Sequence, residues 1–151
     1  GSETAPPADA AAGERAGAVI LDTDILSAIV SPRCPDRVKR ELVAAEGDVF
    51  TTSVSWAEIC YGLAKHRAGA RLRKHYQEMV LPAVTILPFD GPCAEVYGLL
   101  RSELENQDRR LAEADLMIAS VALRHDLPLV SGNVRHFSRV PGLVVVNWFE
   151  E

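Results

Sequence analysis

The sequence predicts an α/β domain in three layers, with a mainly parallel sheet of five strands between helices. Short aliphatic and β-branched runs alternate with longer stretches of helical periodicity, which is the pattern of strand-helix-strand units. The first run, residues 18–21, consists of four consecutive apolar residues, too short and too uniform for an amphipathic helix. Such a run predicts a parallel strand that is buried on both faces.

Composition separates a tail from the domain. Residues 1–17 contain no Val, Ile, Leu or aromatic side chain, so we expect a disordered tail, with Gly1 and Ser2 as a cloning scar. Residues 18–151 are then one domain. Neither a signal peptide nor a membrane-spanning run of about 18 apolar residues is recognisable. We therefore expect a soluble protein without a membrane partner.

Charge and cysteine content narrow the classes of function. The formal net charge of −5 argues against a protein that binds nucleic acid over its whole surface, so any such contact must be local. Cys34, Cys60 and Cys93 are widely spaced and form no CxxC pair. This spacing predicts structural thiols in a reducing cytoplasm and excludes a zinc site of the usual kind.

The first half of the domain continues with two helices, a strand and a long helical stretch. The helices are expected over residues 24–30 and from Pro35 to residue 43, with Gly47 and Asp48 ending the second. Residues 49–52 predict the second strand. Helical spacing then runs from residue 59 to residue 80, where Pro82 closes it.

The second half repeats the alternation. A strand at residues 84–87 is followed by a long amphipathic helix over residues 90–104 and by a nearly all-apolar helix over residues 111–123. The last two strands are expected at residues 128–131 and 143–146.

Asp22 stands at the tip of the first strand, where ligands bind in open parallel sheets. The alternative is that an aspartate here caps the next helix. Asp24 fits that capping role better than Asp22, because it directly precedes the helical run.

Glu58 follows the second strand in the same way. Taken alone, however, Ser55-x-x-Glu58 is a capping-box pattern, in which the glutamate bonds back to the start of its helix. Asp115 lies on the apolar helix and shares a face with Ile118 and Ala119, which would carry its carboxylate inward. Helix capping is the alternative for Asp115 too.

Asp22, Glu58 and Asp115 can meet at one edge of the sheet, and Asn133 follows the fourth strand at that same edge. Carboxylates and an amide without a His or Cys set are hard oxygen ligands, which Mg²⁺ or Mn²⁺ prefers. Such crowded carboxylates need a cation or a proton to neutralise them.

The basic residues concentrate in residues 65–75, directly after Glu58. An ordinary solvated helix face is the simpler interpretation. The alternative is a rim that contacts RNA phosphates. Its candidate residues are Arg67, Arg71, Arg73 and Lys74.

Four segments in order resemble the motifs of PIN-domain ribonucleases, in particular the VapC toxin branch of bacterial type II toxin–antitoxin pairs. The segments are residues 21–26, 53–62, 114–119 and 133–137, and the resemblance extends over about residues 18–149.

The resemblance implies specific roles. Asp22, Glu58 and Asp115 would be the acidic triad that binds Mg²⁺ or Mn²⁺, with Thr23 and Asn133 supporting it. Relatives often have a fourth acid in the last motif, where this chain has Asn133 and His136. We therefore expect one firmly bound ion, and His136 is a possible RNA contact.

The function implied by the resemblance is metal-dependent endonucleolytic cleavage of structured RNA, either tRNA or rRNA, which inhibits translation. The resemblance also implies a cytoplasmic homodimer that a VapB-like antitoxin neutralises.

Two other functions remain open from the residues. Residues 19–24 also fit a haloacid-dehalogenase-like phosphatase, in which Asp22 would be a nucleophile, although the lysine and late acidic pair of that family are missing. A non-catalytic module that binds a basic partner at its acidic edge is the other alternative.

Overall fold

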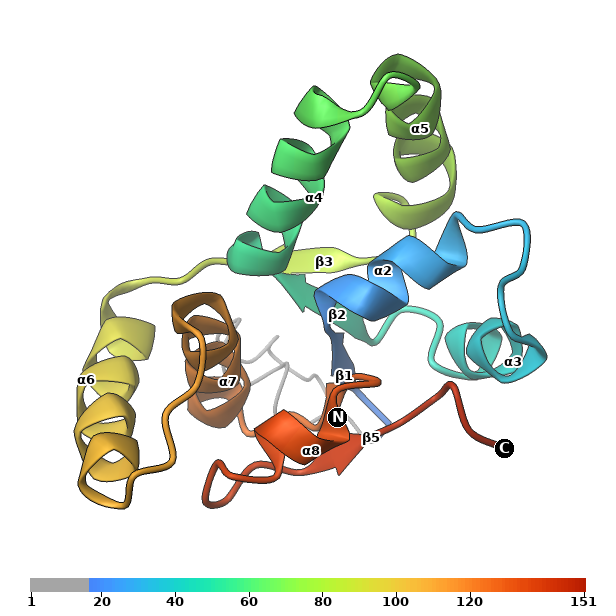
Figure 1. Ribbon diagram of the computed structural model, residues 1–151. Helices are drawn as coiled ribbons and strands as arrows, with labels where there is room; N and C mark the ends of the chain where they lie inside the picture. The colour runs from blue at the N-terminus through green and yellow to red at the C-terminus, as the bar shows by residue number, and fades with distance from the viewer. Residues whose placement is uncertain (1–16) are drawn as a thin grey trace, which may run out of the picture.

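The computed structural model describes residues 17–151 (Figure 1). Residues 1–16 of the expected disordered tail, with the cloning scar, lie outside the described residues. Within residues 17–151, no helix combines the length and apolar character needed to cross a bilayer.

Five strands form one sheet in the order β3-β2-β1-β4-β5, and all four neighbouring pairs are parallel. The mainly parallel sheet predicted from the sequence is therefore entirely parallel within the described chain. The strands are β1 (Val19–Leu21), β2 (Val49–Thr52), β3 (Thr85–Leu87), β4 (Leu129–Val130) and β5 (Val145–Val146).

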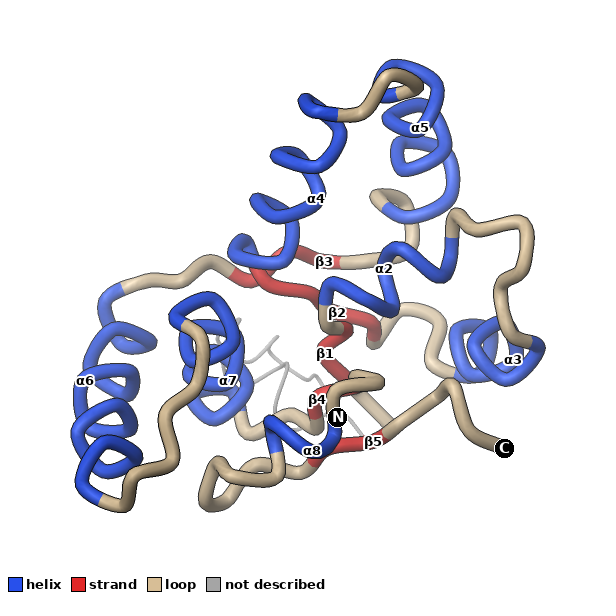
Figure 2. The backbone as a smooth tube through the Cα atoms, viewed as in Figure 1, coloured by secondary structure: helices blue, strands red, loops and turns tan. Residues whose placement is uncertain are grey.

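Helices cover both faces of this sheet, which gives the three-layer α/β/α arrangement (Figures 1 and 2). The α-helices are α2 (Thr23–Ile29), α3 (Asp36–Ala44), α4 (Ser53–Lys65), α5 (Gly69–His75), α6 (Gly91–Asn106), α7 (Glu113–His125) and α8 (Val134–Phe137). A π-helical turn, η1 (Tyr76–Val80), continues α5.

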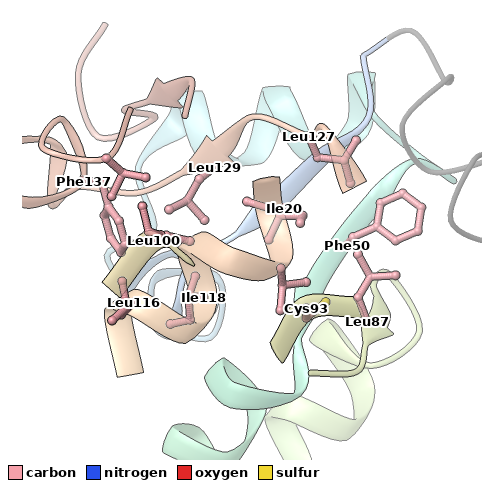
Figure 3. Packing of buried hydrophobic residues seen from close by; sticks show 14 of the residues in the cluster. Ile20, Phe50, Leu87, Cys93, Leu100, Leu116, Ile118, Leu127, Leu129 and Phe137 are labelled. Atoms are coloured by element: carbon pink, nitrogen blue, oxygen red, sulfur yellow. The ribbon is translucent and has the colours of Figure 1, made fainter. Parts of the chain in front are cut away.

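Strands β1, β4 and β5 are apolar throughout because each face of the sheet has its own core. Ile20 and Leu129 pack with α6 and α7 in one cluster (Figure 3), whereas Leu21 and Val130 pack with α2, α3 and α4 in the other. Successive side chains of a strand point to opposite faces, so a run without polar residues fits a strand between two helical layers.

β1 lies in the centre of the sheet, with β2 on one side and β4 on the other. The chain passes from β1 to β2 on one side of the sheet and from β4 to β5 on the other side. The carboxyl-end edge between β1 and β4 is therefore a topological switch point. Asp22 and Ser131 directly follow these two strands. The fold thus brings polar residues from distant parts of the sequence to one edge.

The expected helical stretch over residues 59–80 is wrong as a single helix. α4 ends at Lys65, and the chain turns before α5 begins at Gly69. The two helices pack against each other as an arm, with the turn at its tip (Figure 1). The short helix α8 was not expected either.

Candidate active site

Asp22 is the N-cap of α2, and both of its carboxylate oxygens are occupied. Oδ1 accepts the backbone N–H of Thr23 at 2.8 Å, and Oδ2 accepts the hydroxyl of Ser131 at 2.7 Å. The side chain is 6% exposed. Burial raises the pKa of Asp22 to about 6, and the charges of Asp24 and Asp115 add to this rise, against the two hydrogen bonds.

Asp24 is not the helix cap that the sequence favoured. The helix begins one residue earlier than expected, so Asp22 caps it and Asp24 lies in its first turn. Asp24 Oδ2 accepts the backbone N–H of Gly132 at 2.9 Å, whereas Oδ1 is buried without a hydrogen-bond partner in the described structure. Burial raises the pKa of this carboxyl too.

Glu58 does not form the capping box that was the alternative interpretation of its motif. α4 begins at Ser53, and its cap is Thr52, whose hydroxyl accepts the N–H of Ser55 at 2.9 Å. Glu58 is therefore one turn inside the helix and exposed. Its Oε1 accepts the hydroxyl of Thr23 at 2.7 Å, which joins α4 to the start of α2.

Asp115 lies in the first turn of α7, and the cap residue Ala112 makes no side-chain hydrogen bond. Helix capping by Asp115 is therefore wrong. Burial raises the pKa of the half-buried Asp115, and the charge of Glu58 raises it further, while His136 opposes the rise. Glu58 and His136 are thus among the charged groups that act on Asp115.

The fourth expected motif, residues 133–137, lies at the same edge of the sheet and is joined to Asp22 through Ser131. The N–H of Asn133 donates to Ser131 Oγ at 2.9 Å, and its side-chain amide lies 3.0 Å from Nδ1 of His136. Ser131 thus links this loop to Asp22. Ser131 was not predicted from the sequence as a site residue, although its position at the end of a buried strand is the same signal that singled out Asp22.

The four basic candidates are exposed and lie on the arm. Arg67 is in its tip, and the other three are on α5 (Figure 1). Within residues 17–151, no ion pair connects any of them to the carboxylates. Lys74 instead lies 4.0 Å from Glu78, one turn further along.

The donors fit a hard divalent cation in kind. They are carboxylate oxygens, one of which, Asp24 Oδ1, is buried and unpaired, a costly state that a cation or proton relieves. In the present side-chain conformations, however, no three Asp, Glu, His or Cys groups of residues 17–151 are placed to hold a metal ion together. Coordination of an ion therefore requires some of these side chains to rotate. Glu58 is exposed and has room to do so.

Two curated proteins illustrate the similarity of this chain to known sequences. "Ribonuclease VapC2" of Rickettsia felis is 31% identical over 131 residues, which covers 85% of this chain and 96% of that protein. "tRNA(fMet)-specific endonuclease VapC" of Shigella flexneri is 30% identical over 129 residues, with coverage of 85% and 96%.

Solved structures share the fold. VapBC2 from Rickettsia felis, bound to a DNA fragment from its promoter, has a TM-score of 0.80 at 29% identity and covers 86% of this chain and 98% of that chain. A toxin-antitoxin complex from Klebsiella pneumoniae has a TM-score of 0.66 at 26% identity, with coverage of 89% and 100%.

The family model of the PIN domain matches residues 19–143. This match leaves no support for the phosphatase alternative. The chain therefore belongs to the PIN-domain family, in the branch that contains the VapC ribonuclease toxins.

Proposed function

We propose that this protein is a divalent-metal-dependent endoribonuclease toxin whose substrate is a structured RNA, either tRNA or rRNA. The observation that carries the proposal is the grouping of Asp22, Glu58 and Asp115 at the switch point of the sheet, from three elements far apart in sequence. Relatives named as a ribonuclease and as a tRNA(fMet)-specific endonuclease support the substrate class.

In the proposed site, Asp22, Glu58 and Asp115 hold Mg²⁺ or Mn²⁺, and Asp24 is a further candidate carboxylate. The chemistry that such an ion supplies when bound is Lewis acidity, which lowers the pKa of water and neutralises phosphate charge. Ser131 orients Asp22 through its hydroxyl, and Thr23 holds Glu58 toward α2. These two contacts restrict the conformations of the Asp22 and Glu58 side chains before an ion binds.

The experiment compares RNA cleavage by the wild-type protein and three isosteric variants, Asp22→Asn, Glu58→Gln and Asp115→Asn. Metal-loaded protein is incubated with total RNA, and the cut sites are mapped by sequencing. Each variant should abolish cleavage while keeping a cooperative unfolding transition. If activity only tracks the folded fraction in all three, the carboxylates are structural and the proposal fails.

His136 offers a test of how many ions the site holds. It stands where relatives often have an acid, and it faces both Asn133 and Asp115. If the missing acid weakens a second ion, His136→Asp should tighten Mn²⁺ binding in calorimetry. Unchanged binding would assign His136 to packing or to phosphate contact.

We also propose that the protein is a homodimer and that an antitoxin of the VapB type neutralises it. The solved toxin-antitoxin relatives support such a partner. A basic side chain of the antitoxin would be attracted to the carboxylates of the site. Co-purification with a candidate antitoxin of the VapB type, followed by mass measurement of the complex, tests both statements.

A further inference from the structure

Gly132 stands between a carboxylate of the proposed site and an aromatic ring from the C-terminus. Its N–H donates to Asp24 Oδ2. A Cβ atom on Gly132 would lie 2.8 and 2.9 Å from two ring carbons of Phe149 and 3.0 Å from the same Asp24 oxygen. The ring and the carboxylate therefore approach one small volume, which is open only because residue 132 has no side chain.

The segment that carries Phe149 is held in place on both sides of the ring. Trp148 is buried, at 3% exposure, and the N–H of Phe149 donates to the side-chain oxygen of Asn147 at 2.8 Å. Arg37 of α3 donates to the backbone carbonyls of Asn147 and Glu150. The ring is thus positioned before any ligand arrives, which lowers the entropy that binding would cost.

Phe149 is nevertheless 40% exposed, unlike the buried Trp148 beside it. Two carbons of its ring, Cδ2 and Cε2, border Gly132, and part of the residue is open to solvent. A singly exposed aromatic residue needs no explanation by itself. Phe149, however, lies at the edge of the acidic site, where an exposed ring can contact a bound substrate.

An acidic site has difficulty holding RNA by phosphate contacts alone. The carboxylates repel phosphates, the net charge is −5, and the basic residues Arg67 and Arg71 lie on the arm. Base stacking on an aromatic ring needs no positive charge and suits any unpaired base, because every base has a π-face.

We propose that Phe149 is a base-stacking residue of the RNA site, which receives one unpaired nucleotide of the substrate on its exposed ring surface beside Asp24. This inference rests on the proposed ribonuclease function and deepens it, because it requires a substrate with an unpaired base near the cleaved bond. Phe149 acts by positioning RNA and takes no part in the chemical step.

The test measures RNA binding in the Asp115→Asn background, which prevents cleavage. The probes are short single-stranded RNA oligonucleotides that carry 2-aminopurine at successive positions, since stacking quenches its fluorescence. Phe149→Leu keeps an apolar side chain but removes the π-face, and Phe149→Trp keeps the π-face. Leu99→Ala, at a 78% exposed residue of α6, is the control for loss of an exposed apolar group.

Phe149→Leu should raise the Kd roughly 5- to 50-fold and abolish the quenching at one probe position. Phe149→Trp should retain both binding and quenching, and Leu99→Ala should behave as the parent. Thermal unfolding should be similar in all four proteins. Equal binding by Phe149→Leu and the parent overturns the inference, as does loss of binding in Phe149→Trp.

Two further outcomes separate this inference from the proposed function. If the wild-type protein cleaves RNA and Phe149→Leu cleaves it with the same KM, only the inference fails. If the wild-type protein neither cuts RNA nor binds the probes, the proposed function fails and the inference with it. A monomer–dimer shift in Phe149→Leu that accounts for the whole loss of binding would assign the ring to a protein interface and overturn its role in stacking.

Discussion

Asp22 has a structural role, and it also belongs to the proposed metal site. Its oxygens cap α2 through Thr23 and bind the Ser131 hydroxyl, so both the helix start and the β4 loop depend on it. Burial, with the charges of Asp24 and Asp115, raises its pKa to about 6. In the metal-free protein at neutral pH, a group of this kind opposes folding when it is ionised.

The pH dependence of metal-free stability tests this description. Because the folded pKa of Asp22 lies above the unfolded value of 3.8, its contribution to stability is fully present below about pH 4 and is lost as the pH rises through 6. Asp22→Asn should therefore raise the free energy of unfolding at pH 7, by on the order of 1–3 kcal/mol.

The measurement is denaturant unfolding in EDTA between pH 4 and 8, with Asp36→Asn on the exposed start of α3 as the control. The difference between Asp22→Asn and wild type should grow from pH 4 to pH 7, whereas the control should show a small and constant difference. Parallel curves for Asp22→Asn and wild type would contradict the raised pKa.

The role of a single residue could be predicted from the sequence where its place at the end of a strand determines that role. It could not be predicted where the role depends on which residue begins a helix. Asp22 could be singled out because a buried strand ends on it. Asp24 was given a capping role, and capping was the alternative for Glu58, because a cap and a site carboxylate have the same sequence pattern. The choice between them depends on whether α2 begins at residue 23 or 24 and whether α4 begins at Ser53 or after Ser55, a difference within the usual uncertainty of helix boundaries.

At the scale of elements, the break between α4 and α5 is the main feature that periodicity could not predict. The apolar spacing continues across it, because Leu63 and Leu72 both pack in the same core. The break depends on a tertiary contact: Gly69 is buried directly against the backbone of Leu63. The N–H of Ala68 also donates to Nδ1 of His66, which supports the turn.

Gly69→Ala should destabilise the arm. Its Cβ would clash with the backbone carbonyl oxygen of Leu63, and a backbone atom cannot move aside cheaply. We expect a loss of about 1–3 kcal/mol in the free energy of unfolding. Gly98→Ala in α6 is the matched control, because no atom lies within 4 Å of its Cβ and the substitution should stabilise by roughly 0.5–1 kcal/mol. Equal effects at the two glycines would show that the close approach to Leu63 is unimportant.

The charge of the arm allows a test of its proposed contact with RNA. If Arg71 and Arg73 touch phosphates, Arg71→Gln/Arg73→Gln should weaken binding about equally for all RNA sequences. The slope of log K against log salt should fall by roughly 1.4, at ~0.7 per phosphate of a single strand. Arg33→Gln/Lys39→Gln, which removes two exposed charges near and on α3, is the control.

An unchanged salt slope would make this face an ordinary solvated surface. A slope that stays constant while the dimer dissociates at higher protein concentration would instead place the two arginines at a dimer rim. Binding is measured by titration of fluorescent RNA in the Asp115→Asn background at several salt concentrations.

For the whole molecule, the alternation of strands and helices was sufficient to predict a parallel sheet with carboxylates at one edge. The sequence could not supply the strand order, because β1, β2 and β4 are all short, largely buried runs and local pattern does not determine which strands pair. The central position of β1 places Asp22 beside Ser131, and that contact could not be predicted from either segment alone.

The acidic edge makes a prediction for the stability of the whole domain. Mg²⁺ or Mn²⁺ that binds only the folded protein should raise its melting temperature by mass action, with about 2.7 kcal/mol gained at 100 times the Kd. Asp115→Asn removes one charged oxygen donor from the proposed site and should abolish most of this gain. Asp126→Asn is the matched control, because Asp126 is exposed at the end of the same helix, in a left-handed conformation that asparagine tolerates.

The comparison separates specific binding from simple screening of the net charge of −5. Specific binding predicts that wild type and Asp126→Asn gain equally from the ion, that Asp115→Asn gains little, and that EDTA reverses the gain. Screening acts on all surface charges, so it predicts the same gain in the three proteins and an equal effect of NaCl at matched ionic strength. Equal gains in the three proteins would therefore contradict a metal site that includes Asp115.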